Sequence, residues 1–321
     1  MILSGNGPKQ QVVFDQAVAL VREVFPRSNP LQQPTPENWS ERQKLLPHLH
    51  ALHDVYHSAK PHISGSLDFA QLLLDAGIDQ FEAGISHEAL VLLYTAEEVL
   101  GASSEDNSRL KADINAMIGI MYDTTGIEHR RECLARRVAA LEIRKKVFQE
   151  ATMPRRQDEI LLYNASMEYA ISLLHYHRYN EAEPLLEECL SKYKEWDTEE
   201  VIPFEYAKYY NKIGLVRMYQ GKFAEAIDLA AHSVKLMAQT GYKMFKTRFE
   251  YDMACIILQS GDLDRALQLH MDIYGLRIET LGATNELTLH SMYAIGAIHE
   301  LKGSFDDAEW VFLSWARTLA V

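Results

Sequence analysis

A three-point signature recurs along this 321-residue chain and constrains its fold more than any other feature. A small residue is followed seven positions later by glycine or its substitute, and an alanine comes five positions after that. The complete copies are Gly77, Gly84 and Ala89; Ala170, His177 and Ala182; Gly214, Gly221 and Ala226; Ala254, Gly261 and Ala266; and Gly296, Gly303 and Ala308. A sixth copy, Gly119 and Gly126, loses its alanine to an insertion around EHRRECLARR. Such regular recurrence predicts stacked units of one kind.

Each position of the signature has a steric reason. The first small residue and the alanine are expected where two antiparallel helices cross closely, because a larger side chain would push them apart. The middle glycine is expected to end the first helix in a left-handed conformation. Apolar residues between the signatures recur at three and four, as in LLLDAGIDQFEAGISHEALVLLYTAEEVL (72–100), and alternating Val/Ile/Thr-rich runs are missing. The sequence therefore predicts an all-α chain of helix pairs.

The turn positions 84, 126, 177, 221, 261 and 303 recur at intervals of 40 to 51 residues, which exceeds the roughly 34 residues of a standard tetratricopeptide repeat. The units resemble tetratricopeptide repeats of the kinesin-light-chain type. The resemblance is clearest in YGLRIETLGATNELTLHSMYAIGAIHELKGSFDDAEWV (274–311) and in ALEIRKKVF (140–148). It implies a right-handed α-α superhelix, a tetratricopeptide-type solenoid of about six helix pairs, over residues 65–321.

The N-terminal part resembles something narrower. FDQAVALVREVFP (14–26) and PENWSERQKLLPHLHAL (36–52) are similar to the segment that joins the nucleotide-binding and winged-helix region to the repeats in fungal NLR-like proteins. The resemblance implies that residues 1–64 form N-terminal capping helices and a proline-rich linker. The chain contains no GxxxxGK[ST] phosphate-binding loop, so ATP-driven switching is not implied.

Composition limits the partners and the compartment. The formal net charge of −13 disfavours binding to a phosphate backbone, so we expect no nucleic-acid partner. Cys133, Cys189 and Cys255 are too far apart for a paired metal motif and are typical of reduced thiols. We find neither a secretory n-region followed by an apolar run nor a stretch of 18 apolar residues, so we expect a cytoplasmic protein without a membrane partner.

LPHLHALHDVYH (46–57) raises the question of a metal site. His50, His53 and His57 are spaced so that one helix face could present them to zinc, but Asp54 does not reproduce the HExxH pattern. The stretch is better interpreted as a capping helix with a buried stripe of Leu46, Leu49, Leu52 and Val55. We expect no bound metal and no cofactor.

The basic stretch HRRECLARRVAALEIRKK (129–146) has two interpretations. The first is a solvated helix face whose cations flank an apolar stripe of Leu134, Val138, Leu141 and Val147. The second is a docking patch for an acidic partner.

The resemblance to tetratricopeptide arrays also implies a ligand groove. In those arrays the first helix of each pair lines a concave surface, with groove positions six and three residues before the small residue. Transferred to this sequence, these positions give the predicted ligand-binding residues Asn164, Lys208, Asn211, Arg248, Tyr251, His290 and Tyr293. Cations, amides and aromatic rings on neighbouring turns suit an extended peptide with carboxylates or a polar, partly aromatic small molecule.

The function predicted from the sequence is recognition. A peptide, protein tail or small ligand would occupy the concave groove, in an adaptor or sensor role. The alternative is an enzyme of a fungal small-molecule pathway, with His290 or a tyrosine as acid or base and Arg248 holding an anion. Self-association through the C-terminal helix is also expected as a hypothesis, because no later repeat covers Trp310 and Trp315.

Overall fold

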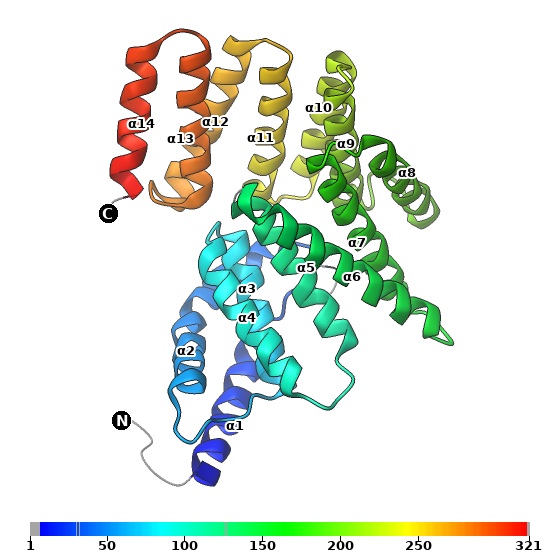
Figure 1. Cartoon of the computed structure of the whole chain (residues 1–321), viewed down its shortest axis with the longest axis vertical. Helices are drawn as coiled ribbons and strands as arrows, with labels where there is room; N and C mark the ends of the chain where they lie inside the picture. Colours follow the sequence, from blue (N-terminus) through cyan, green and yellow to red (C-terminus); the bar gives the residue numbers. More distant parts are fainter. Residues whose placement is uncertain (1–6, 30, 32, 126, 320–321) are drawn as a thin grey trace. The chain divides into compact units, whose positions relative to one another are not determined.

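The computed structural model describes residues 7–29, 31, 33–125 and 127–319, and all of their regular structure is helical (Figure 1). The α-helices are α1 (Gly7–Val24), α2 (Trp39–Ser58), α3 (Leu67–Glu82), α4 (Ser86–Ala102), α5 (Ser108–Thr125), α6 (Arg130–Glu150), α7 (Arg156–His175), α8 (Tyr179–Trp196), α9 (Pro203–Tyr219), α10 (Phe223–Gln239), α11 (Lys243–Gln259), α12 (Leu263–Leu281), α13 (Glu286–Leu301) and α14 (Phe305–Leu319). Two 3-10 helices, η1 (Pro36–Asn38) and η2 (Ile127–His129), are interspersed. The all-α prediction is confirmed, since the described residues contain no strand.

The chain divides into two compact units, residues 1–169 and 170–321. The division falls inside α7, within the predicted array. This division separates two compact parts of the chain and does not test the predicted boundary between the capping segment (1–64) and the repeats (65–321). That boundary stays a prediction.

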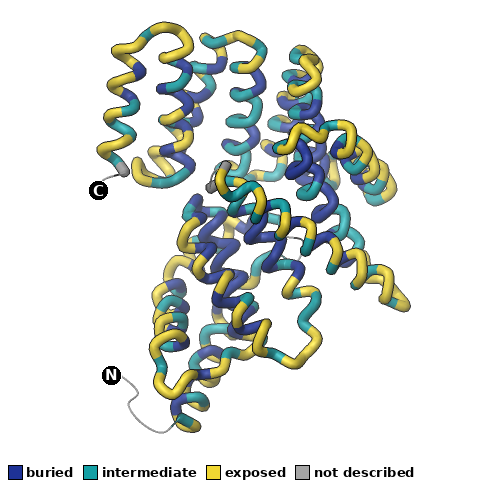
Figure 2. Tube along the Cα trace, viewed as in Figure 1, coloured by how far each residue is buried: buried dark blue, intermediate teal, exposed yellow. Residues whose placement is uncertain are grey.

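In the first unit, α3 pairs with α4 and α5 pairs with α6, while α4 also contacts α5. Helices α1 and α2 both contact α3. As a result α3 is buried from Phe69 to Phe81 apart from the half-buried Gln71, and it appears dark blue along most of its length in Figure 2. The N-terminal helices thus cover the first helix of the first repeat.

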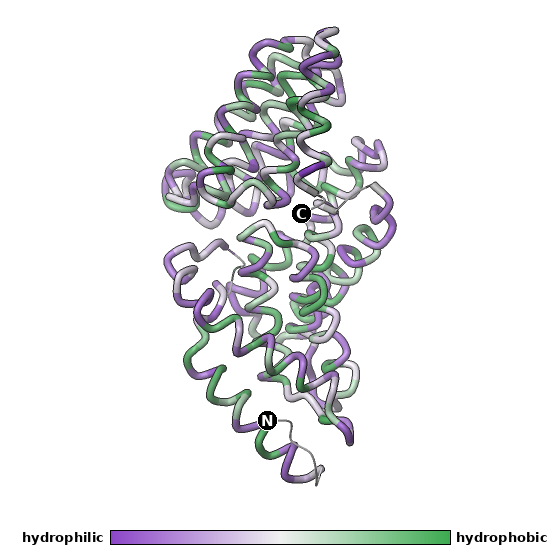
Figure 3. The backbone as a smooth tube through the Cα atoms, turned by 90° about the vertical axis from the view of Figure 1, so that its left-hand side faces the viewer, coloured by the Kyte–Doolittle hydropathy of each residue, from purple (hydrophilic) through white to green (hydrophobic). Residues whose placement is uncertain are grey.

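In the second unit, α9 pairs with α10, α11 with α12 and α13 with α14. Contacts between α10 and α11 and between α12 and α13 join the pairs, and α9 also contacts α11. Hydrophilic and hydrophobic residues alternate along these helices, as Figure 3 shows, because each helix buries one stripe. The first helices of the first two pairs, α9 and α11, are therefore neighbours.

The repeat signature has the predicted geometry. A Cβ atom on Gly214 would lie 3.3 Å from the carbonyl oxygen of Ala226, so the crossing of α9 and α10 leaves little room for a side chain. Gly221 ends α9 with a φ of +75°, and His177 adopts the same left-handed region with a φ of 57° in its copy. Gly126 of the sixth copy lies outside the described residues.

The histidine-rich stretch is part of α2, as predicted. Leu46, Leu49 and Leu52 are buried, whereas Val55 is half-buried. The Nε2 atoms of His53 and His57 each lie 2.9 Å from the hydroxyl oxygen of Thr95 on α4. Within the described part of the chain, no three His, Cys, Asp or Glu side chains are grouped so as to hold a metal ion.

The predicted apolar stripe of the basic helix α6 is partly wrong. Arg137 and Arg144 are buried, while Val138 is exposed. The buried positions of α6 follow a spacing of four, three and four residues that runs through Cys133, Arg137, Ala140 and Arg144. Arg137 pairs with Asp123 and Glu168, and Arg144 pairs with Asp113, so these cations are internal counterions and not parts of a solvated face.

Candidate ligand-binding surface

Six of the seven predicted ligand-binding residues lie on three helices of the second unit. Lys208 and Asn211 are on α9, Arg248 and Tyr251 are on α11, and His290 and Tyr293 are on α13. His290 and Tyr293 are exposed, Lys208, Arg248 and Tyr251 are half-buried, and Asn211 is buried. The seventh, Asn164, is buried on α7 in the first unit.

Two aromatic rings connect the predicted cations of α9 and α11. The Nζ atom of Lys208 lies 5.1 Å from the ring centroid of Phe204, and the Cζ atom of Arg248 lies 5.5 Å from that of Phe245. The two phenylalanine rings are themselves 5.8 Å apart. These cation–π and ring contacts link Lys208 on α9 to Arg248 on α11.

Arg277 of α12 is a buried cation beneath this surface, with 1% of its surface exposed. Its Nε and Nη2 atoms donate to the hydroxyl and carbonyl oxygens of Thr247 on α11, at 3.1 and 3.0 Å. Its Nη1 atom donates to the carbonyl oxygen of Leu287 and the hydroxyl of Ser291 on α13, at 2.7 and 2.9 Å. All of these partners are uncharged, so the hydrogen bonds are satisfied while the positive charge has no direct counterion among the described residues.

Burial disfavours the charged form of the Arg277 guanidinium. Desolvation lowers the pKa of Arg277 to about 10, although Tyr251, Asp252 and Glu250 act in the opposite direction. A guanidinium remains fully charged at neutral pH at that value. Its charge therefore acts on whatever lies on the adjoining surface.

Tyr251 separates this buried charge from the surface. The Cζ atom of Arg277 lies 5.4 Å from the Tyr251 ring centroid, and the ring of His270 packs edge-on against Tyr251 with centroids 4.9 Å apart. His270 is fully buried, and neither of its ring nitrogens has a hydrogen-bond partner in the described structure. Desolvation, assisted by Arg277, lowers the pKa of His270 to about 4, so its ring is neutral.

His290 is exposed, yet its surroundings disfavour its charged form. Its pKa is lowered first by desolvation and then by the positive charges of Arg277 and Arg248, while Glu286 acts in the opposite direction. Two guanidiniums therefore act on one small region next to His290, and an anion would be stabilised there.

Aromatic contacts connect this region to the last helix. The ring of Tyr293 lies 5.6 Å from that of Phe312 and 5.9 Å from that of Trp315, both on α14. Burial raises the pKa of Tyr251, and the nearby Tyr293 contributes in the same direction. The structure thus brings together four of the predicted residues, namely Arg248, Tyr251, His290 and Tyr293.

Sequence reasoning missed Arg277 and His270, although a signal was present. The buried stripe of α12 runs through Ala266, His270, Ile273 and Arg277, with the same four, three and four spacing as in α6. A charged or polar residue at any place of such a stripe predicts a buried ionisable group. Arg144 in ALEIRKKVF and Arg277 in YGLRIETLG occupy the same place of this stripe in their helices.

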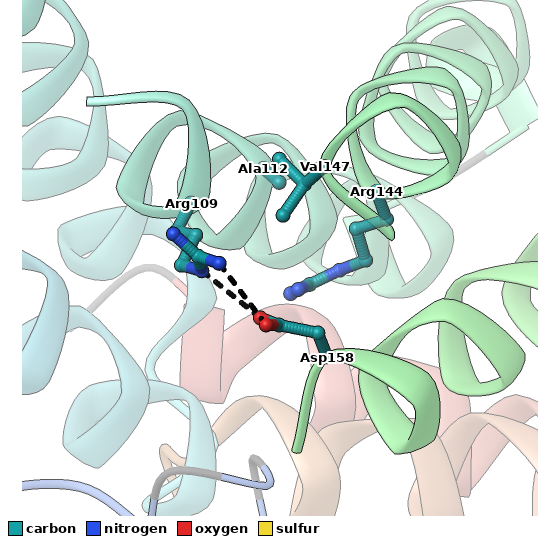
Figure 4. A pocket seen from close by; sticks show the side chains of 5 residues that line it. All are labelled: Arg109, Ala112, Arg144, Val147 and Asp158. Atoms are coloured by element: carbon teal, nitrogen blue, oxygen red, sulfur yellow. Dashed lines mark hydrogen bonds and ion pairs between the residues drawn. The ribbon is translucent and has the colours of Figure 1, made fainter. Parts of the chain in front are cut away.

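A second polar site lies in the first unit at the ends of α5, α6 and α7. Asp158 accepts two hydrogen bonds from Arg109, at 2.9 and 3.0 Å, and two from Arg155, both at 3.0 Å. These arginines hold the pKa of Asp158 well below its usual range. Arg144 extends into the same small pocket (Figure 4), which has room for about one water molecule. We interpret this cluster as a structural ion-pair network.

The fold and the surface define the chain as a helical-repeat protein built from tetratricopeptide-like helix pairs. Two solved structures of nearly identical TPR-like repeats, from a Podospora anserina protein assigned to the kinesin light chains, are similar to it. One of them, a variant with a single substitution, shares 17% sequence identity with a TM-score of 0.45, and the match covers 68% of this chain and 98% of that one. The other shares 16% identity with a TM-score of 0.44 and covers 67% and 97%. No protein-family model and no curated protein matches the sequence.

Proposed function

We propose that the surface formed by α9, α11 and α13 binds a carboxylate-bearing peptide, protein tail or small ligand, in an adaptor or sensor role. The observation that carries this proposal is the buried charge of Arg277, whose hydrogen bonds all go to uncharged groups. Together with Arg248 it favours an anion beside His290, in a chain whose net charge is −13. An anionic ligand would supply the missing counterion.

The neighbouring groups support an extended ligand. Asn211 is 1% exposed, and both its amide oxygen and its amide nitrogen lack a hydrogen-bond partner in the described structure. Tyr293 and Lys208 provide an aromatic ring and a cation at the two ends of this surface. A peptide that passes from α9 to α13 would meet cations and aromatic rings in turn.

Binding of labelled peptides tests the proposal. We expect Glu- and Asp-rich peptides to bind, and their Gln- and Asn-matched versions to bind at least about tenfold more weakly, because a hydrogen bond to a charged group contributes about 1.5–3 kcal/mol. Arg248→Gln should weaken binding of the acidic peptides by a similar factor. The matched control is Arg265→Gln on the exposed side of α12. Equal affinity of the acidic and neutral peptides, or no effect of Arg248→Gln, would contradict the proposal.

The enzyme alternative uses the same surface. The lowered pKa of His290 favours its neutral form, which supports a role as general base, and Arg248 would hold an anionic substrate. Native mass spectrometry of protein purified from its own source separates the two proposals. A retained small molecule whose mass changes during incubation favours the enzyme, whereas a bound peptide or an unchanged ligand favours recognition.

Three further proposals concern the protein as a whole. We propose that it is cytoplasmic, because its three cysteines form no disulfide. We propose that its N-terminal segment corresponds to the junction segment of fungal NLR-like proteins, on the strength of residues 14–26 and 36–52. Self-association through α14 is supported by Trp310, 69% exposed, and by Leu313. None of the described helices is long and apolar enough to cross a membrane.

A further inference from the structure

An acidic row on α3 faces the segment that joins α1 to α2. Asp75, Asp79 and Glu82 are spaced four and three residues apart, so they lie on one face of the helix. The joining segment, residues 25–38, is called the strap here. It contains four of the ten prolines of the chain, and its described residues have no regular structure apart from η1. All contacts described below involve the described residues of the strap.

Main-chain amides of the strap are bound by the carboxylates of this row. The amide nitrogen of Ser28 donates to Oδ1 of Asp75 at 3.3 Å, and that of Thr35 donates to Oε2 of Glu82 at 3.4 Å. Arg22, at the end of α1, pairs with the same Asp75 at 2.6 Å. Thr35 is buried, as is the preceding Pro34. The strap is therefore held against α3 at both of its ends.

Arg42 of α2 holds the strap from the other side. Its side chain is completely buried and donates to the carbonyl oxygens of Pro26, at 3.3 Å, and Arg27, at 3.0 Å. Its Nη1 atom lies 3.6 Å from Oδ1 of Asp79, which also accepts a hydrogen bond from Gln43 through Oδ2 at 3.3 Å. Arg42 thus joins the strap, α2 and the acidic row.

The charges around Asp79 and Glu82 do not balance when both are ionised. Arg42 is the cation whose charge acts on both carboxylates, while Glu37 of η1 adds a further negative charge near Glu82. Asp75 has its own cation in Arg22. The buried Asp79 and the half-buried Glu82 then share the charge of one guanidinium, an arrangement that the removal of one negative charge would stabilise.

We propose that the strap is a proton-linked clasp, docked on α3 while the Asp79–Glu82 pair holds a proton and loosened when both carboxylates are ionised. The clasp belongs to the first unit and is independent of the ligand-binding surface on α9, α11 and α13. Release would uncover part of α3, the first helix of the first repeat, which the N-terminal segment otherwise encloses.

The titration of the two carboxylates agrees with this geometry. Desolvation raises the pKa of Asp79 to about 6 and that of Glu82 to about 7, in spite of the opposing charge of Arg42. Undocking would remove the strap's share of this desolvation and lower the pKa values of both groups towards their ordinary range. Docking is therefore accompanied by proton uptake, so it is favoured at low pH and weakens as the pH rises towards and through 7.

Hydrogen exchange measured by mass spectrometry on the full chain tests this clasp. Protection factors, corrected for intrinsic exchange, are compared between pH 5.5 and 8.5 for peptides spanning residues 25–38, with peptides from α10 as the internal reference. We expect at least about a tenfold loss of protection in the strap relative to α10, since each unit of pKa shift corresponds to a factor of ten. Glu82→Gln cannot ionise and should remove most of this loss, whereas Glu88→Gln, exposed on α4, should retain it.

Two outcomes would overturn the clasp. One is wild-type protection in the strap that does not change between pH 5.5 and 8.5, which decides the question even if a variant fails to fold. The other is a Glu82→Gln protein with native circular dichroism that keeps the full wild-type loss. Asp79→Asn provides a second, independent variant for which we expect the same reduced pH dependence.

Discussion

At the scale of single residues, two buried ionisable side chains of α12 stand out, namely His270 and Arg277. His270 and Arg277 occupy places in the stripe of α12 that are apolar in α10, where Ala230 and Met237 stand. Each costs desolvation free energy, which hydrogen bonds offset for Arg277 but not for His270. Both lie against Tyr251, the central residue of the candidate surface. We therefore connect these unfavourable residues with function, where such residues often occur.

The neutral, buried His270 makes a prediction about stability and pH. Its folded pKa of about 4 is lower than its ordinary value of 6.5, so the unfolded chain binds more protons between these values. The free energy of unfolding should consequently fall as the pH decreases from 6.5 towards 4, by an amount on the order of 1–3 kcal/mol. Urea unfolding at several pH values measures this, and His270→Met should flatten the dependence. Replacement of the exposed His48 by Gln should not, and a His270→Met protein with the wild-type slope would refute the argument.

At the scale of helices, the sequence predicted the features that depend on apolar periodicity and on side-chain size. The crossing at Gly214 and the left-handed turn at Gly221 follow from side-chain size alone, and both are observed. The stripe of α6 was predicted wrongly because Val138 was assigned to the interior by its apolar character. Arg137 occupies the interior instead, since acidic residues on neighbouring helices neutralise it. Periodicity locates a buried face, but the pairing of charges is settled by residues far away in sequence.

The terminal helix α14 leads to a prediction about assembly. Its buried side is anchored by Ala308 and Val311, whereas Trp310 and Leu313 are exposed. An exposed tryptophan next to an exposed leucine favours association in water. Sedimentation velocity should show a concentration-dependent increase in mass, which Trp310→Ala should abolish. Leu20→Ala, at an equally exposed position on α1, is the control. A wild-type protein that stays monomeric over a roughly hundredfold range of concentration would exclude this role.

At the scale of the whole molecule, the candidate surface carries positive charge in a chain that is negative overall. The net charge of −13 repels anions at a distance, so an anionic ligand must be attracted at short range by Arg248 and Arg277. The repeat register predicted which first-helix residues meet near Tyr251. It could not predict Arg277, because that residue comes from the second helix of its pair and is buried, with hydrogen bonds to α11 and α13. Contact of these residues with a ligand stays a prediction.

The imidazole of His290 provides the most direct test that a carboxylate binds at this surface. Its pKa can be followed by NMR titration, with His290→Gln to assign the resonance, in the free protein and in the presence of a saturating Glu-rich peptide. The account predicts that the pKa of His290, lowered in the free protein by desolvation and by two arginines, rises when the peptide binds, because a carboxylate stabilises the imidazolium. A peptide that saturates the protein and leaves the pKa of His290 unchanged would contradict the account.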